Sequence, residues 1–177
     1  MTAPMNTYIQ NNLIDMVKEK LLLERITLNG VDVNKRDNEG KNALYWAIKK
    51  RSTHNANLLI SFGSSFMVKG DKHALFHALE CGQHEMLVLL VERGQDINTV
   101  DSLGKTILMY AIEMEVFESV KYLVSHGADM YVLDNALNMA EDYAKSSNSE
   151  LIQSYLQHII YTDMQTTPSN RTVSKHR

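Results

Sequence analysis

Apolar residues recur along this chain at spacings of three and four, which is the period of one face of an α-helix. Residues 42–50 and 55–61 show this pattern, and so does the N-terminal stretch 1–28. Gly63 closes the second of these segments, as is common just past the C-terminus of a helix. The pattern therefore predicts short α-helices joined in pairs.

The helix pairs repeat with a period close to 33 residues. The closing glycines are spaced 33, 31 and 33 residues apart: Gly30, Gly63, Gly94 and Gly127. An alanine in the first helix recurs at spacings of 31 and 33 residues: Ala47, Ala78 and Ala111. The leucine three residues before each alanine should lie on the same helical face. This period predicts a stack of repeats in which each unit covers its apolar face against its neighbours.

The repeats divide the chain into one domain, 1–161, and a tail. We expect an N-terminal cap or degenerate repeat, three repeats and a C-terminal capping repeat, over 1–36, 37–68, 69–100, 101–133 and 134–161. In the last unit we expect Leu137 and Ala140 to take the places of the repeated leucine and alanine. Residues 162–177 are rich in Thr, Ser, Asn and basic residues, which predicts a disordered polar tail.

The repeated motif resembles the ankyrin repeat, over roughly residues 30–156. The family motif reads Asp-x-x-Gly-x-Thr-Pro-Leu-His-x-Ala, followed by a second helix and Gly-Ala-Asp-Val-Asn. The unit 101–133 matches it at Asp101, Gly104, Thr106, Leu108, Ala111, Gly127, Ala128 and Asp129. The resemblance implies an all-α ankyrin-repeat solenoid of stacked helix-turn-helix units with short hairpin-like turns.

The chain departs from the family motif at two positions in every repeat. The family's proline is replaced by Ala43, Ala74 and Ile107, and its histidine by Tyr45, Phe76 and Met109. A proline at the start of a helix presets φ. We therefore expect each repeat to be less stable than a repeat of an idealised array.

Composition narrows the function classes. The 177 residues carry a formal net charge of −3, which gives no reason to expect binding to nucleic acid or to a membrane. No secretory signal pattern is visible at the N-terminus, and the longest apolar run, 86–91, is too short to span a membrane. A single cysteine, Cys81, fits a reducing compartment. We expect a cytoplasmic protein, and secretion by a route without a signal peptide stays open.

Residues that could form a metal or catalytic site have competing structural roles. A zinc site would draw on ligands with spacings of four residues or fewer: His73, His77, Cys81 and His84. Structural roles are favoured, because Gly82 ends the first helix before His84. Residues 104–106, Gly-Lys-Thr, resemble a phosphate-binding loop, but that motif needs a glycine where Thr99 stands. We expect no enzyme, no metal and no cofactor.

A stack of this kind leaves a concave side, built from turn tips and first helices, that is free to bind another molecule. Trp46, His77 and Tyr110 form one aromatic column beside the alanines and serve either as anchors for a partner or, as we favour, in packing between helices. The other candidate contact positions lie at turn tips and after the alanines: Asn38, Glu39, Lys41, Lys49, Lys50, Glu80, Ser102, Leu103, Lys105 and Glu113. Their charges suggest a surface that is positive at its N-terminal end and negative further on.

These features predict a non-catalytic protein–protein interaction module: an adaptor, inhibitor or scaffold that is monomeric by itself and binds another protein. The alternative is the binding component of an enzyme or effector system, such as a host-targeting effector of a bacterium or virus, or the antidote to a toxin.

Overall fold

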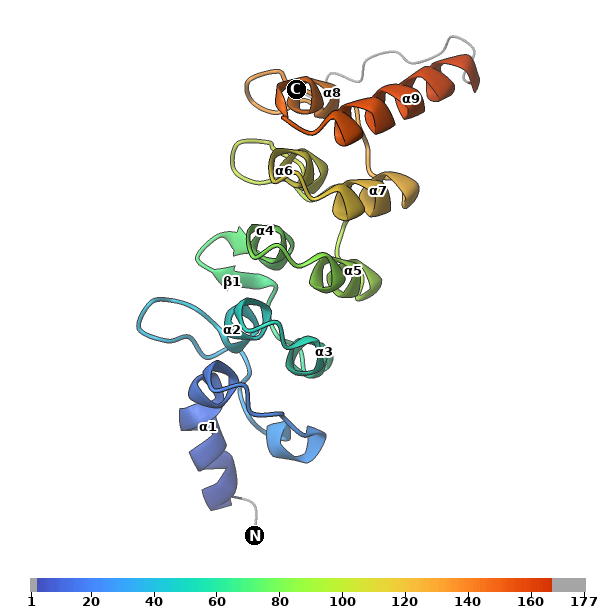
Figure 1. Ribbon diagram of the computed structural model, residues 1–177. Helices are drawn as coiled ribbons and strands as arrows, with labels where there is room; N and C mark the ends of the chain where they lie inside the picture. The colour runs from blue at the N-terminus through green and yellow to red at the C-terminus, as the bar shows by residue number, and fades with distance from the viewer. Residues whose placement is uncertain (1–2, 167–177) are drawn as a thin grey trace.

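The computed structural model describes residues 3–166 as a single file of stacked helix pairs (Figure 1). The pairs, in chain order, are α2 (Ala43–Lys49) with α3 (Thr53–Ser61), α4 (Ala74–Glu80) with α5 (His84–Glu92), α6 (Ile107–Glu113) with α7 (Phe117–Ser125), and α8 (Ala140–Ser146) with α9 (Glu150–Thr166). Helix α1 (Ala3–Lys18) and the 3-10 helix η1 (Arg25–Leu28) cover the N-terminal end of the stack. The mostly helical solenoid confirms the predicted fold class.

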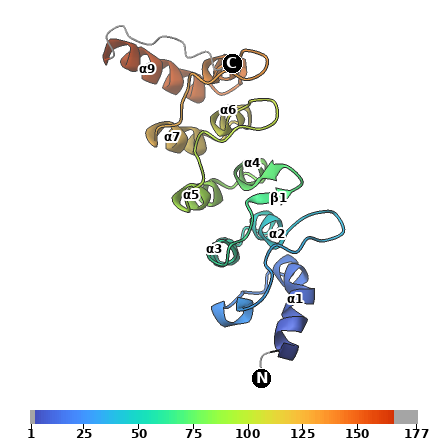
Figure 2. The ribbon, with the colours of Figure 1, turned by 180° about the vertical axis from the view of Figure 1, so that it is seen from behind.

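Both views of the ribbon place the first helices of the pairs in one column and the second helices in another (Figures 1 and 2). The turns that precede the first helices project outward beside the first column. We call the side formed by α2, α4, α6, α8 and these turns the first-helix face.

A polar side chain starts each of the first helices α2, α4 and α6 by capping it. Asn42 and Thr106 accept hydrogen bonds from the backbone N–H groups of Tyr45 (2.9 Å) and Met109 (3.2 Å). His73 does the same through Nδ1, from the N–H of Leu75 at 3.2 Å. These bonds satisfy backbone donors that a helix start leaves without an intrahelical partner.

One apolar core runs the length of the stack. The predicted leucine and alanine columns are fully buried in it: Leu44, Leu75, Leu108, Ala47, Ala78 and Ala111 all have 0% exposed surface. The small alanines let neighbouring helices approach closely, and the leucines fill the space between repeats. The sequence prediction of these two columns is confirmed.

The third unit opens with a two-stranded antiparallel hairpin, β1 (Met67–Lys69) and β2 (Lys72–His73). The second and fourth units have single β-bridges at the equivalent place, Arg36 to Asn42 and Val100 to Thr106. The hairpin takes the place of the longer turn that the sequence lacks here.

The C-terminal end differs from prediction in two respects. Helix α9 continues to Thr166, so a disordered tail is wrong for residues 162–166; a hydrogen bond from the Tyr131 hydroxyl to Asp163 Oδ2, 2.8 Å, helps to hold this extension. Residues 167–177, the rest of the predicted tail, lie outside the described residues. Leu137, predicted to join the leucine column, is instead 73% exposed. The chain is still in its turn there, and Ala144 takes the place of the repeated alanine.

Leu137 occupies the turn position that Gly40 and Gly104 hold in other units, with φ of 66° against 73° and 74°. This left-handed conformation costs an L-residue roughly 1–2 kcal/mol. Leu137→Gly is therefore expected to raise the free energy of unfolding by about 0.5–1 kcal/mol, after the greater entropy of glycine in the unfolded chain is subtracted. Urea denaturation measures this difference.

Ala136→Gly, in the same turn, is the matched control. Ala136 is absent from the residues with positive φ, so its replacement should only add unfolded-state entropy and lower stability. If both variants lose stability equally, the conformation assigned to Leu137 is wrong.

Candidate functional site: the first-helix face

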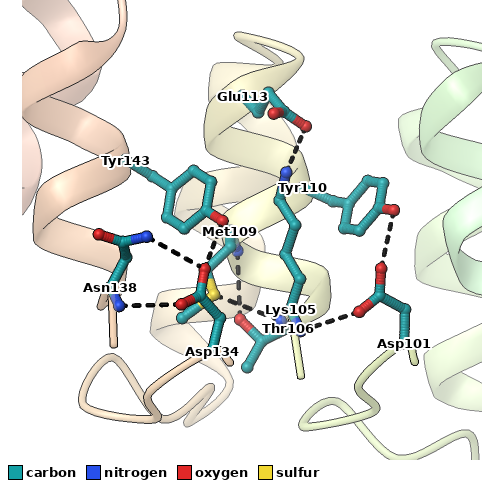
Figure 3. A network of polar contacts seen from close by, with 9 residues as sticks. All are labelled: Asp101, Lys105, Thr106, Met109, Tyr110, Glu113, Asp134, Asn138 and Tyr143. Atoms are coloured by element: carbon teal, nitrogen blue, oxygen red, sulfur yellow. Dashed lines mark hydrogen bonds and ion pairs between the residues drawn. The ribbon is translucent and has the colours of Figure 1, made fainter. Parts of the chain in front are cut away.

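An aspartate organises each full turn on the first-helix face. Asp101 Oδ1 accepts from the backbone N–H groups of Leu103 and Lys105, at 2.8 and 2.9 Å. Its Oδ2 accepts from the Tyr110 hydroxyl at 3.0 Å (Figure 3). Asp134 repeats the arrangement with Tyr143, at 2.6 Å, and Asp37 repeats it with the indole Nε1 of Trp46, at 2.9 Å. The turn is thereby fixed to the helix that follows it.

Burial and these hydrogen bonds set the protonation of the pairs. Burial raises the pKa of Tyr110 to about 12, and the bond to Asp101 acts in the same direction. The pKa of Tyr143 is raised by the same two causes, while the bond from Tyr143 lowers the pKa of Asp134. At neutral pH the phenols are therefore neutral donors and Asp134 is an ionised acceptor.

The third unit lacks this tie. Val68, fully buried, stands at the position of the turn aspartate, and His77 stands at the position of the aromatic residue. His77 is only 4% exposed and stacks on Tyr45, with ring centroids 4.0 Å apart. It packs between repeats, in agreement with the packing role favoured for this column, and lies too deep to anchor a partner.

The other two members of the aromatic column are half-buried. Tyr110 meets Phe76 edge to face, at 4.7 Å, so it too contacts the preceding repeat. Trp46 meets Tyr45 of its own helix, at 5.3 Å. Both rings pack within the stack while part of each remains accessible.

Two lysines predicted as contact positions are covered. Lys41 is 6% exposed and Lys105 is 8% exposed. Lys105 runs between Tyr110 and Tyr143, with Nζ 4.5 and 4.6 Å from their ring centroids, and ends in an ion pair with Glu113 (Figure 3). Lys105 therefore joins neighbouring repeats, although the sequence predicts a surface position for it.

The remaining predicted contact positions lie in two rows along the face. The turn tips carry exposed Asn38, Glu39, Ser102 and Leu103, of which Leu103 is 62% exposed. The C-terminal ends of the first helices carry exposed Lys49, Glu80 and Glu113, with Lys50 half-buried. Between these rows lie the accessible parts of Trp46 and Tyr110.

A polar pocket of about 360 Å³ opens at the C-terminal end of this face. Its lining includes the carboxylates of Glu113, Glu115 and Asp142 together with the ring of Tyr143. Asp142 accepts from the N–H of Met139, and Glu115 accepts from the N–H of Asn148, at 2.9 and 2.7 Å. Three carboxylates therefore gather at the C-terminal end of the first-helix face.

The four candidate metal ligands have structural partners instead. His73 Nε2 lies 2.9 Å from Gln95 Oε1, and His84 Nδ1 lies 3.1 Å from Ser119 Oγ. Cys81 Sγ is 3.9 Å from the ring of His77, and burial raises the pKa of its thiol. Within residues 3–166 no three His, Cys, Asp or Glu side chains gather closely enough to hold a metal ion.

One residue of the site was missed from the sequence. Lys18, at the end of α1, places its Nζ 4.7 Å from the ring centroid of Trp46 and 3.7 Å from Asp37 Oδ2. Its position depends on how α1 packs against α2, for which the sequence carries no local signal.

Over the described part of the chain, no helix is both long and apolar enough to span a membrane.

Comparison with known proteins agrees with this architecture. Residues 66–134 match the family model for ankyrin repeats, in three copies. The chain is 29% identical over 163 residues to a putative ankyrin repeat protein, FPV022, of fowlpox virus (strain NVSL), which covers 87% of this chain and 28% of that protein. It is 29% identical over 149 residues to a B-cell lymphoma 3 protein homolog of Mus musculus, covering 78% of this chain and 32% of that protein.

A third relative is the E3 ubiquitin-protein ligase hecd-1 of Caenorhabditis elegans, 32% identical over 109 residues, covering 59% of this chain and 4% of that protein. The chain thus spans about a third or less of these relatives. Ankyrin repeats are generally protein–protein interaction modules without enzymatic activity. The repeat period, the stacked helix pairs and these matches place the chain in the ankyrin repeat family.

Proposed function

We propose that this chain is a non-catalytic module that captures a partner protein on its first-helix face. The observation that carries the proposal is that α2, α4 and α6 each have two sides of different character. One side of each helix is buried in the core, while the opposite side and the turn before it present accessible polar and aromatic groups. The proposed contact residues are Asn38, Glu39, Trp46, Lys49, Lys50, Glu80, Ser102, Leu103, Tyr110 and Glu113.

The chemistry of the face supports binding rather than catalysis. The tyrosines that lie nearest to carboxylates have a raised pKa, so at neutral pH they donate hydrogen bonds and do not serve as bases or nucleophiles. The covered lysines are held in ion pairs and over aromatic rings. We expect Lys41, Lys105 and His77 to hold the surface residues in place rather than to contact the partner.

A paired charge reversal tests the proposal. Glu80→Lys with Glu113→Lys changes two exposed positions on the face. The Lys72–Glu80 pair that is lost lies at the surface and is worth roughly 0–1 kcal/mol. Loss of the Glu113 partner leaves the covered Lys105 unpaired and costs more. In affinity capture with the full chain as bait, followed by mass spectrometry, we expect retention of the partner to fall by about tenfold, equivalent to roughly 1.4 kcal/mol.

Glu85→Lys with Glu118→Lys is the matched control, since both residues are exposed at the starts of the second helices α5 and α7. It carries the same charge change away from the face and should leave capture unchanged. Thermal unfolding of both variants verifies that they fold. Equal losses from the two pairs would reject the first-helix face as the binding surface.

The alternative function is the binding component of an enzyme or effector system. It is favoured by the relatives in which the matched segment is a small part of a much larger protein, the ligase hecd-1 among them. The same capture experiment separates the two functions. A catalytic subunit that remains with the bait in stoichiometric amount supports the alternative, and a partner without catalytic subunits supports an adaptor, inhibitor or scaffold.

A further inference from the structure

Three lysines surround the indole of Trp46 at the N-terminal end of the first-helix face. The Nζ atoms of Lys18, Lys41 and Lys49 lie 4.7, 4.8 and 5.3 Å from the ring centroid. We call Trp46 with these lysines the Trp46 cluster. Cation–π contacts with the ring face hold ammonium groups in place without using a carboxylate.

Three carboxylates lie beside the lysines of the Trp46 cluster. Asp15 and Asp37 lie 3.6 and 3.7 Å from Lys18 Nζ, and Glu39 pairs with Lys41. The Oδ2 of Asp37 also accepts from Trp46. The pKa of Asp37 is lowered because its hydrogen bonds, led by that from the Lys41 N–H, outweigh the effect of burial. Lys49 is exposed, and the described residues give it no carboxylate at ion-pair distance. The lysine charge of the cluster that faces solvent outside an ion pair is therefore that of Lys49.

The neighbouring repeats show that Lys49 is a departure from the chain's own pattern. It stands two residues after its alanine, where the next two units have Glu80 and Glu113. Those glutamates pair with the lysine eight residues earlier, Lys72 or Lys105. Lys49 instead adds a like charge beside Lys41. Lys49 contacts the Trp46 ring but lacks the ion pair of the later repeats, and this departure from the pattern points to a binding role.

Charge along the stack limits what this end can bind. Residues 1–68 contain nine Lys or Arg and six Asp or Glu, a net charge of +3, whereas residues 69–161 contain six and fourteen, a net charge of −8. A long polyanion or an anionic membrane lying along the face would be repelled by the acidic part. A short acidic segment that contacts only the basic part is attracted there and avoids repulsion by the acidic part.

We propose that the Trp46 cluster binds an Asp- and Glu-rich segment of the partner protein, whose continuation toward α6 and α8 is neutral or basic. The proposal rests on the proposed function and names the chemistry of the partner. Carboxylates of the segment accept from Lys49, and the glutamates of the later repeats exclude segments that are acidic throughout.

The sole tryptophan of the chain lies within the site, so its fluorescence reports occupancy directly. The probe is a synthetic peptide with a block of glutamates at one end and a block of lysines at the other, and the same residues in alternation form the comparison peptide. We expect the block peptide to change Trp46 emission and to bind more tightly than the alternating one. Its binding should weaken as salt is added, because exposed charges are screened beyond about 8 Å at physiological ionic strength.

Lys49→Glu is the decisive variant. It restores the ion pair that Lys105 and Glu113 make in the fourth unit, so the melting temperature should stay the same or rise. Affinity for the block peptide should nevertheless fall at least about tenfold. Lys121→Glu, exposed on α7, carries the same charge change and should leave affinity unchanged.

Several results would overturn the proposal. The first is an equal effect of Lys49→Glu and Lys121→Glu on affinity for the block peptide, and the second is equal binding of the two peptides. The third is binding of oligothymidylate or of phosphatidylserine vesicles that depends on Lys49 and is tighter than binding of the block peptide. If the protein self-associates and Lys49→Glu abolishes this association, the occupant of the site is instead the acidic end of a second copy of the chain. If Lys49→Glu leaves partner capture intact while the Glu80 and Glu113 reversal abolishes it, this inference falls and the proposed function stands. Binding of the block peptide without capture of any partner protein would instead support the acidic-segment site and reject the proposed function.

Discussion

Leu108→Ala is expected to lower the free energy of unfolding by about 2–5 kcal/mol, through lost burial and the cavity that remains. Leu108 has 0% exposed surface on α6, whose neighbours in the stack are α4 and α8 as well as its partner α7. Neither neighbouring unit can close the gap without losing its own contacts. Urea denaturation followed by circular dichroism measures the change as a lower transition midpoint.

Leu151→Ala is the control for this variant. Leu151 is 58% exposed on α9, so the same truncation removes little buried surface there. Comparable losses from the two substitutions would contradict the assignment of Leu108 to a core column shared by three repeats.

Asn55→Ala is expected to detach the N-terminal segment from the stack. The fully buried Asn55 accepts from the N–H of Leu23 at 2.9 Å and donates from Nδ2 to the carbonyl of Leu21 at 2.8 Å. Its removal leaves two main-chain groups without these partners, each at a cost of about 1–3 kcal/mol if it stays buried. Hydrogen exchange should show faster exchange in α1 with little change in α6.

Asn57→Ala, on the same helix, separates this effect from a general loss of helix stability. The Oδ1 of Asn57 is buried without a hydrogen-bond partner, so its removal sacrifices no bond there. We expect α1 to keep its protection in this variant. Loss of α1 protection in both variants would show that Asn55 is not the specific tie.

The repeat period and the buried columns were predictable because they depend on local rules. Helical spacing puts Leu108 and Ala111 on one face wherever the helix lies, and this is why both columns are confirmed. The extension of α9 was not predictable, because a tertiary hydrogen bond from Tyr131 contributes to it.

The candidate site was only partly predictable, for a related reason. Whether Lys105 is exposed depends on the ring of Tyr143 in the next repeat, and whether His77 is exposed depends on Tyr45 in the previous one. Lys18 enters the site from an element outside the repeat pattern. The periodic positions thus indicate which residues are equivalent, but not how deeply a neighbouring repeat covers them.

The bond between the turn aspartate and the aromatic residue nine positions later has a consequence for how such a chain lengthens. Asp101 and Tyr110 lie in the same unit, so a tandem duplication of residues 101–133 would carry its own fixed turn. The new copy would also bring the leucine and alanine needed to pack against either neighbour. The binding face can therefore grow by whole units, with residues such as Lys49 free to vary and give each added unit its own specificity.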